Sequence, residues 1–180
     1  MCAGLGGELM RRRAMHISHG LTSDILYPLE NGTFTSLDGT TVIVSNGNHI
    51  YAKSGETSGA HYVWLSPQVT GWDTAYNIIN ANDKYPVNVL FSLKIGDTVK
   101  FVIKNNNTGI TNKWQKLYVA FVSGIEEKVK SGYFQQKNEL TTEVVVTEDI
   151  DVTALAVHIN REDTEAEFDF EIYVNDVRYF

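Results

Sequence analysis

Residues 167–174 read Glu-Phe-Asp-Phe-Glu-Ile-Tyr-Val, and this stretch decides the fold class. Its apolar residues Phe168, Phe170, Ile172 and Val174 recur at every second position, and the residues between them are acidic or amphipathic. A period of two with aromatic and β-branched residues is typical of a half-buried β-strand. The stretch therefore predicts a sheet with one face toward a core and one toward water.

The same pattern continues on both sides of this stretch. Residues 142–147 are rich in valine, and residues 153–159 alternate large apolar side chains with smaller or polar ones. After the quoted stretch, Asn175-Asp176 is suited to a two-residue turn that leads into residues 177–180. These strands predict an antiparallel arrangement for this part of the chain.

Turn signals divide the preceding residues into further short strands. Asp38-Gly39 and Asn46-Gly47 indicate hairpins, because these residue types tolerate a positive φ. Strands are predicted at residues 25–29, 33–37, 40–45, 49–54, 60–65, 88–94, 98–104 and 116–123, and one short helical turn at residues 125–130. The fold class predicted is all-β, an antiparallel β-sandwich. Its predicted core consists of Phe101, Ile103, Val119, Phe121, Leu155, Val157, Phe168, Phe170 and Ile172.

The first 24 residues differ in composition from the rest of the chain. They are rich in glycine, carry the run Arg11-Arg12-Arg13 and have no sustained period. We therefore expect residues 1–24 to be a flexible N-terminal arm and residues 25–180 to form a single β-sandwich domain.

Composition excludes several classes of partner. The net charge is −7, with the excess of acid in residues 139–180, and nucleic acid is not expected because phosphate binding needs clustered Lys and Arg. No apolar run approaches the ~20 residues that span a bilayer, so membrane insertion is not expected. A single cysteine, Cys2, cannot form an internal disulfide.

The motifs of common enzymes are missing from the sequence. It contains no Gly-rich phosphate loop, no Gly-x-Ser-x-Gly and no His-Glu-x-x-His. His16 and His19 have a spacing that could suit a metal, but no acidic or cysteine partner lies near them. We therefore predict no catalytic residue, no metal ligand and no cofactor, and a protein that is not an enzyme.

Aromatic side chains with amide neighbours are the better candidates for binding. A sugar site combines an aromatic face, which stacks on the C–H face of a pyranose ring, with polar groups that bond its hydroxyls. The predicted ligand-binding residues are Trp72, Tyr76, Trp114, Gln115 and Tyr118. The alternative is structural: the two tryptophans plug the ends of the sandwich, and Tyr118 belongs to the core or to a strand face.

Several segments resemble a known family. Residues 93–101, Leu-Lys-Ile-Gly-Asp-Thr-Val-Lys-Phe, resemble a strand pair of jelly-roll carbohydrate-binding modules, and Lys-Trp-Gln-Lys at 113–116 resembles the tryptophan that follows in them. Residues 142–159 are similar to another strand pair of these modules. Residues 168–180 resemble the closing hairpin of carbohydrate-binding-like domains in tail or head-fibre proteins of phages that infect gut bacteria.

The resemblance implies a non-enzymatic, jelly-roll-like sandwich displayed on the virion surface for adhesion. It implies contacts with other virion proteins through residues 1–24, cell-surface glycans as the ligand, and leaves a homo-oligomer open. No acidic cluster matches a structural calcium site of this family. Two alternatives remain: a sugar-binding module of a secreted or cell-surface protein, and a capsid or tail decoration domain without a ligand.

Overall fold

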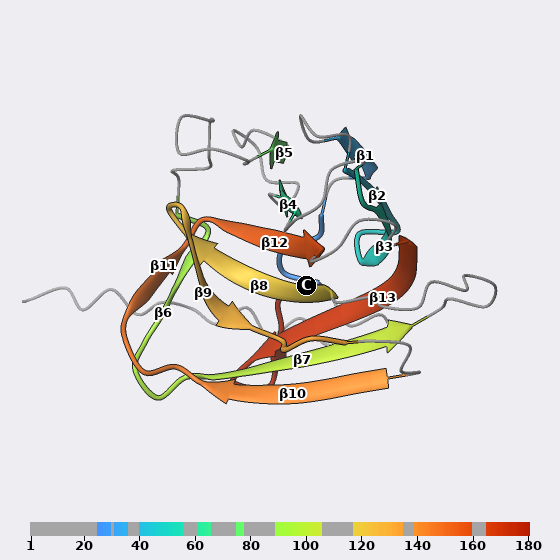
Figure 1. Ribbon diagram of the computed structural model, residues 1–180. Coiled ribbons are helices and arrows are strands. Elements are labelled where there is room, and N and C mark those ends of the chain that lie inside the picture. The colour runs from blue at the N-terminus through green and yellow to red at the C-terminus, as the bar shows by residue number, and fades with distance from the viewer. Residues whose placement is uncertain are drawn as a thin grey trace, which may run out of the picture.

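The computed structural model describes residues 25–29, 31–35, 40–55, 61–65, 75–77, 89–105, 117–134, 139–159 and 165–180. Within these ranges the chain forms fourteen β-strands and no helix, so the all-β prediction is confirmed (Figure 1). It follows that no described helix is long and apolar enough to cross a membrane. The arm predicted at residues 1–24 lies outside the described residues.

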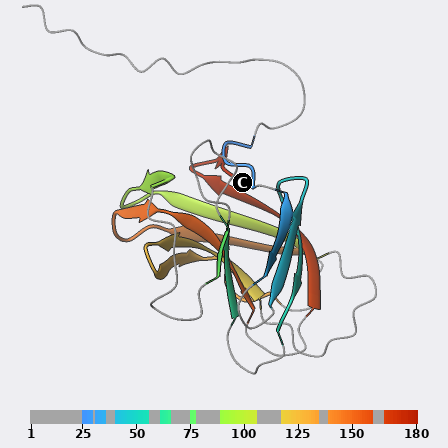
Figure 2. The same cartoon turned by 90° about the horizontal axis from the view of Figure 1, so that it is seen from above.

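The larger sheet is antiparallel, and its central strand is the stretch that the sequence marks most clearly. Its strands are, in spatial order, β1 (Gly32–Thr35), β2 (Thr41–Ser45), β3 (His49–Lys53), β13 (Glu165–Val174), β7 (Thr98–Asn105) and β10 (Glu139–Val145). A seventh strand, β14 (Val177–Arg178), pairs with the end of β13. Strand β13 thus lies between β3 and β7 and joins them (Figure 2).

The second sheet has five antiparallel strands. They are, in spatial order, β5 (Ala75–Asn77), β4 (His61–Leu65), β12 (Ala154–Ile159), β8 (Leu117–Ser123) and β9 (Glu126–Lys130). A two-stranded sheet of β11 (Ile150–Val152) and β6 (Phe91–Leu93) completes the fold. Four neighbouring strands of one sheet, β3-β13-β7-β10, correspond in order to four of the other, β4-β12-β8-β9. The chain passes from the first sheet to the second between β3 and β4 and again between β7 and β8.

The two sheets pack on one shared hydrophobic core (Figure 1). Every residue of the predicted core is at most 1% exposed, so that prediction is confirmed. Aromatic rings join the layers: the ring centroids of Phe101 on β7 and Phe121 on β8 lie 5.9 Å apart, and those of Phe134 and Phe168 lie 5.0 Å apart. Removal of this large apolar area from water stabilises the sandwich.

Two of the predicted turns are present. Asn46 and Gly47, between β2 and β3, have φ values of 54° and 75°. Asn175 and Asp176, between β13 and β14, have φ values of 48° and 65°. Successive positive φ values are what a tight two-residue hairpin requires, and Asp38-Gly39 lies outside the described residues.

Two predictions of local structure are wrong. Residues 125–130 form no helical turn: β9 pairs with β8 after Gly124, whose φ is 59°. The buried Val129, opposite Phe121, holds β9 in the sheet. Residues 25–29 form no regular strand, although the Tyr27 N–H donates to the Tyr179 carbonyl at 2.7 Å.

Candidate functional site

The predicted sugar-binding residues are placed only in part. Trp72, Trp114 and Gln115 lie outside the described residues. Tyr76 is in β5, where its Cα is the register partner of Trp64 in β4. Tyr118 is in β8 and is 4% exposed. Their assembly into one sugar-binding site therefore stays a prediction.

Tyr118 lies on the outer face of the five-stranded sheet, which is the side away from the shared core. The residues that surround it on β8 and β12 are small and buried: Ala120, Val122, Ala154 and Ala156. Strand register creates this patch, because Ala120 is the Cα partner of Ala156 and residues opposite each other share a face. The small side chains leave room for larger ones at the end of the patch, where Tyr118 is opposite His158.

Polar and aromatic side chains gather at that end of the patch. We call this group the Tyr118 cluster; it consists of Tyr118, Glu127, Lys130, Tyr133 and His158. The Tyr118 and His158 rings stack with centroids 4.1 Å apart at 25°. The Tyr118 hydroxyl donates to Glu127 Oε2, and Lys130 Nζ lies 3.1 Å from the same oxygen. His158 Nδ1 lies 3.5 Å from Glu127 Oε1.

Glu127 is the electrostatic centre of the Tyr118 cluster. Its side chain is only 10% exposed. Burial raises the pKa of Glu127, but its contacts with His158, Tyr118 and Lys130 outweigh that effect and hold the pKa below its usual value. The carboxylate is therefore ionised at neutral pH, and Lys130 Nζ also lies 5.1 Å from the centre of the Tyr118 ring.

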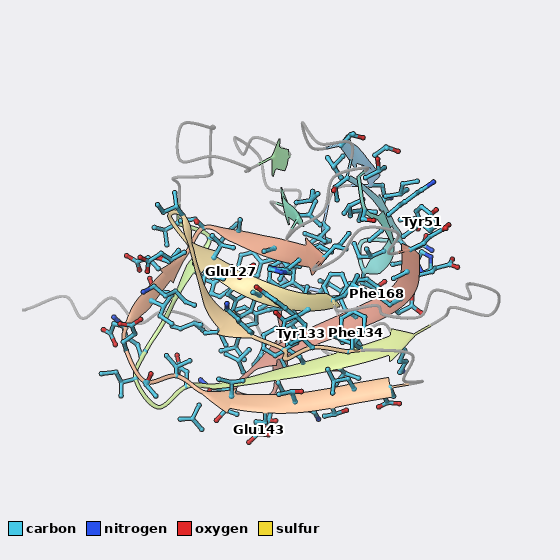
Figure 3. The ribbon with its side chains drawn as sticks, in the orientation of Figure 1. Tyr51, Glu127, Tyr133, Phe134, Glu143 and Phe168 are labelled. Carbon is cyan, nitrogen blue, oxygen red and sulfur yellow. The ribbon has the colours of Figure 1, made fainter. Side chains whose placement is uncertain are left out.

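Tyr133 is the accessible aromatic ring of the Tyr118 cluster, at 50% exposed (Figure 3). Both of its flanks are anchored. The Ser131 N–H donates to the Val119 carbonyl at 2.9 Å, and the Phe134 N–H donates to the Leu117 carbonyl at 2.9 Å. The Tyr133 ring meets that of Tyr118 edge to face, with centroids 5.1 Å apart. An exposed ring on a held backbone loses little freedom when a ligand stacks on it.

A β-bulge explains why the sequence did not reveal this cluster. Strict alternation along β9 would send Glu127 and Lys130 to opposite faces. The register shifts between Phe121 and Val122, so Glu127 is opposite Val122 and Lys130 is opposite Ala120 on the same face. The sequence feature that could have indicated Tyr133 is the glycine before it. Gly132 has a φ of 79° and turns the chain after β9.

A second polar group lies on the outer face of the seven-stranded sheet. His49 on β3 contacts two carboxylates of β13, with Nδ1 2.6 Å from Asp169 Oδ1 and Nε2 3.0 Å from Glu167 Oε1. Burial lowers the pKa of His49, but the hydrogen bonds and charges of Asp169 and Glu167 outweigh it and raise the pKa. A hydrogen bond from the Tyr51 hydroxyl to Glu165 raises the pKa of Tyr51 to about 12.

Neither group is a metal site, since the described residues hold no set of three His, Cys, Asp or Glu side chains arranged for a metal ion. Comparisons with protein-family models, curated proteins and solved structures find no match to this chain. The resemblance to phage carbohydrate-binding-like domains therefore stays a prediction, and the Tyr118 cluster is the basis for inferring a function.

Proposed function

We propose that this protein is a non-enzymatic adhesion module on the surface of a phage virion, and that it binds a cell-surface glycan through the exposed members of the Tyr118 cluster, Tyr133 and Lys130. The observation that carries the proposal is Tyr133, an exposed ring that packs against Tyr118, whose hydroxyl bonds the ionised Glu127 and whose ring lies near Lys130. Its chemistry is that of a sugar site: an apolar platform with a few fixed polar groups.

Each part of the Tyr118 cluster has a role in this proposal. The exposed part of the Tyr133 ring stacks on the C–H face of a pyranose ring. Lys130, whose side chain is 47% exposed, donates to a sugar hydroxyl. Glu127 and the stacked pair of Tyr118 and His158 hold Lys130 and Tyr133 in position through the contacts described above.

We propose Tyr76 as a further member of this site, on the same row of the sheet but on its opposite edge strand. Position 76 pairs with 64, position 64 with Ala156, Ala156 with Ala120, and Ala120 with Lys130. These positions form one row across the sheet, from the edge strand β5 to the opposite edge strand β9. We propose that Trp72, Trp114 and Gln115 extend the same site.

The order of the strands supports a jelly roll. A jelly roll has eight strands in two sheets built from two Greek keys. The runs β3-β13-β7-β10 and β4-β12-β8-β9 supply eight strands. In chain order these strands alternate between the sheets except at β8 and β9, which are neighbours in one sheet.

The state of Glu127 supports a function in binding. A general acid or base works best with a pKa near the operating pH. The pKa of Glu127 is instead below its usual value, because its neighbours stabilise the charged form. A carboxylate of this kind is suited to fix other side chains and to accept hydrogen bonds.

A glycan array followed by titration of the best ligand tests the proposal. Tyr133→Ala should weaken binding at least about 5-fold, the loss expected for one stacked ring, and leave the unfolding midpoint nearly unchanged. Tyr173→Ala is the control, because Tyr173 is a part-exposed ring in another polar group, with Glu171 and Lys100 as neighbours, but lies on the other sheet. Equal losses in both variants would contradict the proposed site.

The same experiments separate the alternatives. A protein that binds no glycan but assembles into particles would be a decoration domain without a ligand, and binding without particle association would identify a secreted or cell-surface module. We further propose that residues 1–24 attach the protein to other virion proteins. Deletion of these residues should remove the protein from particles and leave its circular dichroism unchanged.

A further inference from the structure

The two sheets end in edge strands of different character. Strand β9 has the features that protect an edge: four of its five residues are charged, and it pairs through a β-bulge. Strand β10 has seven residues that pair with β7 without interruption, and it contains no lysine, proline or bulge. No described strand covers its other side (Figure 1).

The charges on β10 protect it only weakly. Its two glutamates, Glu139 and Glu143, lie opposite Lys104 and Lys100 of β7. Opposite charges in register partners offset each other, so the glutamates add little net charge to this edge. On the inner side of the strand, Leu140 and Val144 pack against the core but are only partly buried. The core therefore continues to this edge and stays half covered there.

We propose that two copies of this chain pair through β10, antiparallel and about a two-fold axis at Thr142. Each seven-stranded sheet would then continue into that of the partner. On the outer side, Glu139 would face the partner's Val145, and Thr141 the partner's Glu143. On the inner side, Leu140 would face the partner's Val144. All seven residues of β10 are used, and each glutamate meets an uncharged residue.

Charge selects this register over its neighbours. Side chains alternate between the two faces of a strand. The inner residues of one copy therefore lie opposite inner residues of the other only if the two-fold axis passes through a residue, and not between two residues. An axis at Thr141 places Glu139 opposite the partner's Glu143. An axis at Glu143 places that residue opposite its own copy. Like charges directly opposite are unfavourable, so the axis at Thr142 is preferred.

The first test measures self-association of the full chain at physiological salt by sedimentation equilibrium. The expected mass at micromolar concentration is twice the 20.2 kDa of one chain. Thr141 is an exposed position, so substitutions there keep the fold. Thr141→Glu puts two like-charge pairs into the dimer and should raise the dissociation constant about 2- to 30-fold, whereas Thr141→Lys should lower it by a similar factor.

The second test reports the register directly, in a Cys2→Ser background. Thr142→Cys brings two thiols opposite each other, with Cα atoms about 4.5–5.5 Å apart, which a disulfide can bridge. Thr141→Cys is the matched control: its two copies are offset by two residues and lie roughly 8 Å apart. Mild oxidation should cross-link the first variant and not the second.

The outcomes are decisive in both directions. A monomer at 100 µM would overturn the proposal, as would a dimer whose affinity shifts in the same direction with Thr141→Glu and Thr141→Lys. Preferential cross-linking through Thr141→Cys would show a different interface. Glycan binding plays no part in these readouts, so the dimer stands or fails separately from the proposed function.

Discussion

Polar side chains are exposed to solvent on the outer face of the seven-stranded sheet and largely buried on the outer face of the five-stranded sheet. On the seven-stranded sheet, β13 turns Glu165, Glu167, Asp169 and Glu171 toward solvent, where partners on β3 and β14 offset some of their charge. On the five-stranded sheet, Ala120 and Ala156 fill the centre of the face and are fully buried. Among the described side chains of this face, Tyr118, Lys130 and His158 form one connected polar cluster around Glu127.

This difference in solvent exposure determines how well each face tolerates substitution of its polar side chains. A polar group in water has solvent as an alternative partner, so each pair on β13 contributes little. A buried polar group has no such alternative and depends on its protein neighbours. The seven-stranded face should therefore tolerate changes that the five-stranded face does not.

The largest expected difference comes from one added charge on each face. Ala120→Lys buries an ammonium group beside Lys130, its register partner, and should destabilise the protein by about 3–5 kcal/mol. Val102→Lys is the control on β7, where the side chain is part-exposed beside Glu171, and should change stability by less than about 0.5 kcal/mol. Urea midpoints measure both, and similar losses would contradict the contrast.

An intermediate effect is expected from a matched pair of glutamates that both accept a tyrosine hydroxyl. Glu127→Gln should cost about 1–3 kcal/mol at pH 7, because it removes charge-assisted bonds in a buried site. Glu165→Gln, which alters the bond from Tyr51 on the solvated face, should cost less than about 1 kcal/mol. Urea unfolding at pH 7 compares the two variants.

The pH dependence of Glu127 sharpens this test. Its pKa is lower in the folded state than the usual 4.5, so its stabilisation is present above that value and is lost as pH falls through the folded pKa. The difference in unfolding free energy between wild type and Glu127→Gln should therefore shrink below about pH 4.5. A difference that stays constant to pH 3 would show that the charge is not what stabilises.

The smallest effect is expected at His49 on the solvated face. Its pKa is raised above 6.5 by the nearby carboxylates, so its stabilisation is present below pH 6.5 and is lost as pH rises through the folded pKa. His49→Gln should remove a pH dependence worth less than about 1 kcal/mol between pH 6 and 9. Melting at low and high salt measures it, and an NMR titration of His49 that gives a pKa below 6.5 would refute the assignment.

Much of the fold could be predicted from the sequence, and the reason lies in these two faces. Strand β13 has one face in the core and one face toward solvent. Apolar and polar residues therefore alternate in residues 167–174, and this pattern predicts the sandwich. Strand β8 is buried on both faces, so its sequence lacks the alternation that would show which face contacts the core. Strand β9 hides its pattern because charged residues and a bulge replace alternation.

The site was predicted less well. Of the expected residues, Tyr118 belongs to the cluster, but its neighbours come from β9, β12 and the segment after β9. His158 is 40 positions from Tyr118 in the sequence and meets it only through strand register. Pairing of this kind is a tertiary property, and periodicity along one strand contains no information about it.

The position of β13 between β3 and β7 also sets an order of events during synthesis. The hairpins of β1, β2 and β3 and the strands β7 and β10 are all made before β13, yet only β13 joins them into one sheet. Until it leaves the ribosome, each half presents an open edge. Closure then requires contacts between distant residues, so we expect slow folding and a nascent chain whose strand edges stay open to aggregation until β13 is made.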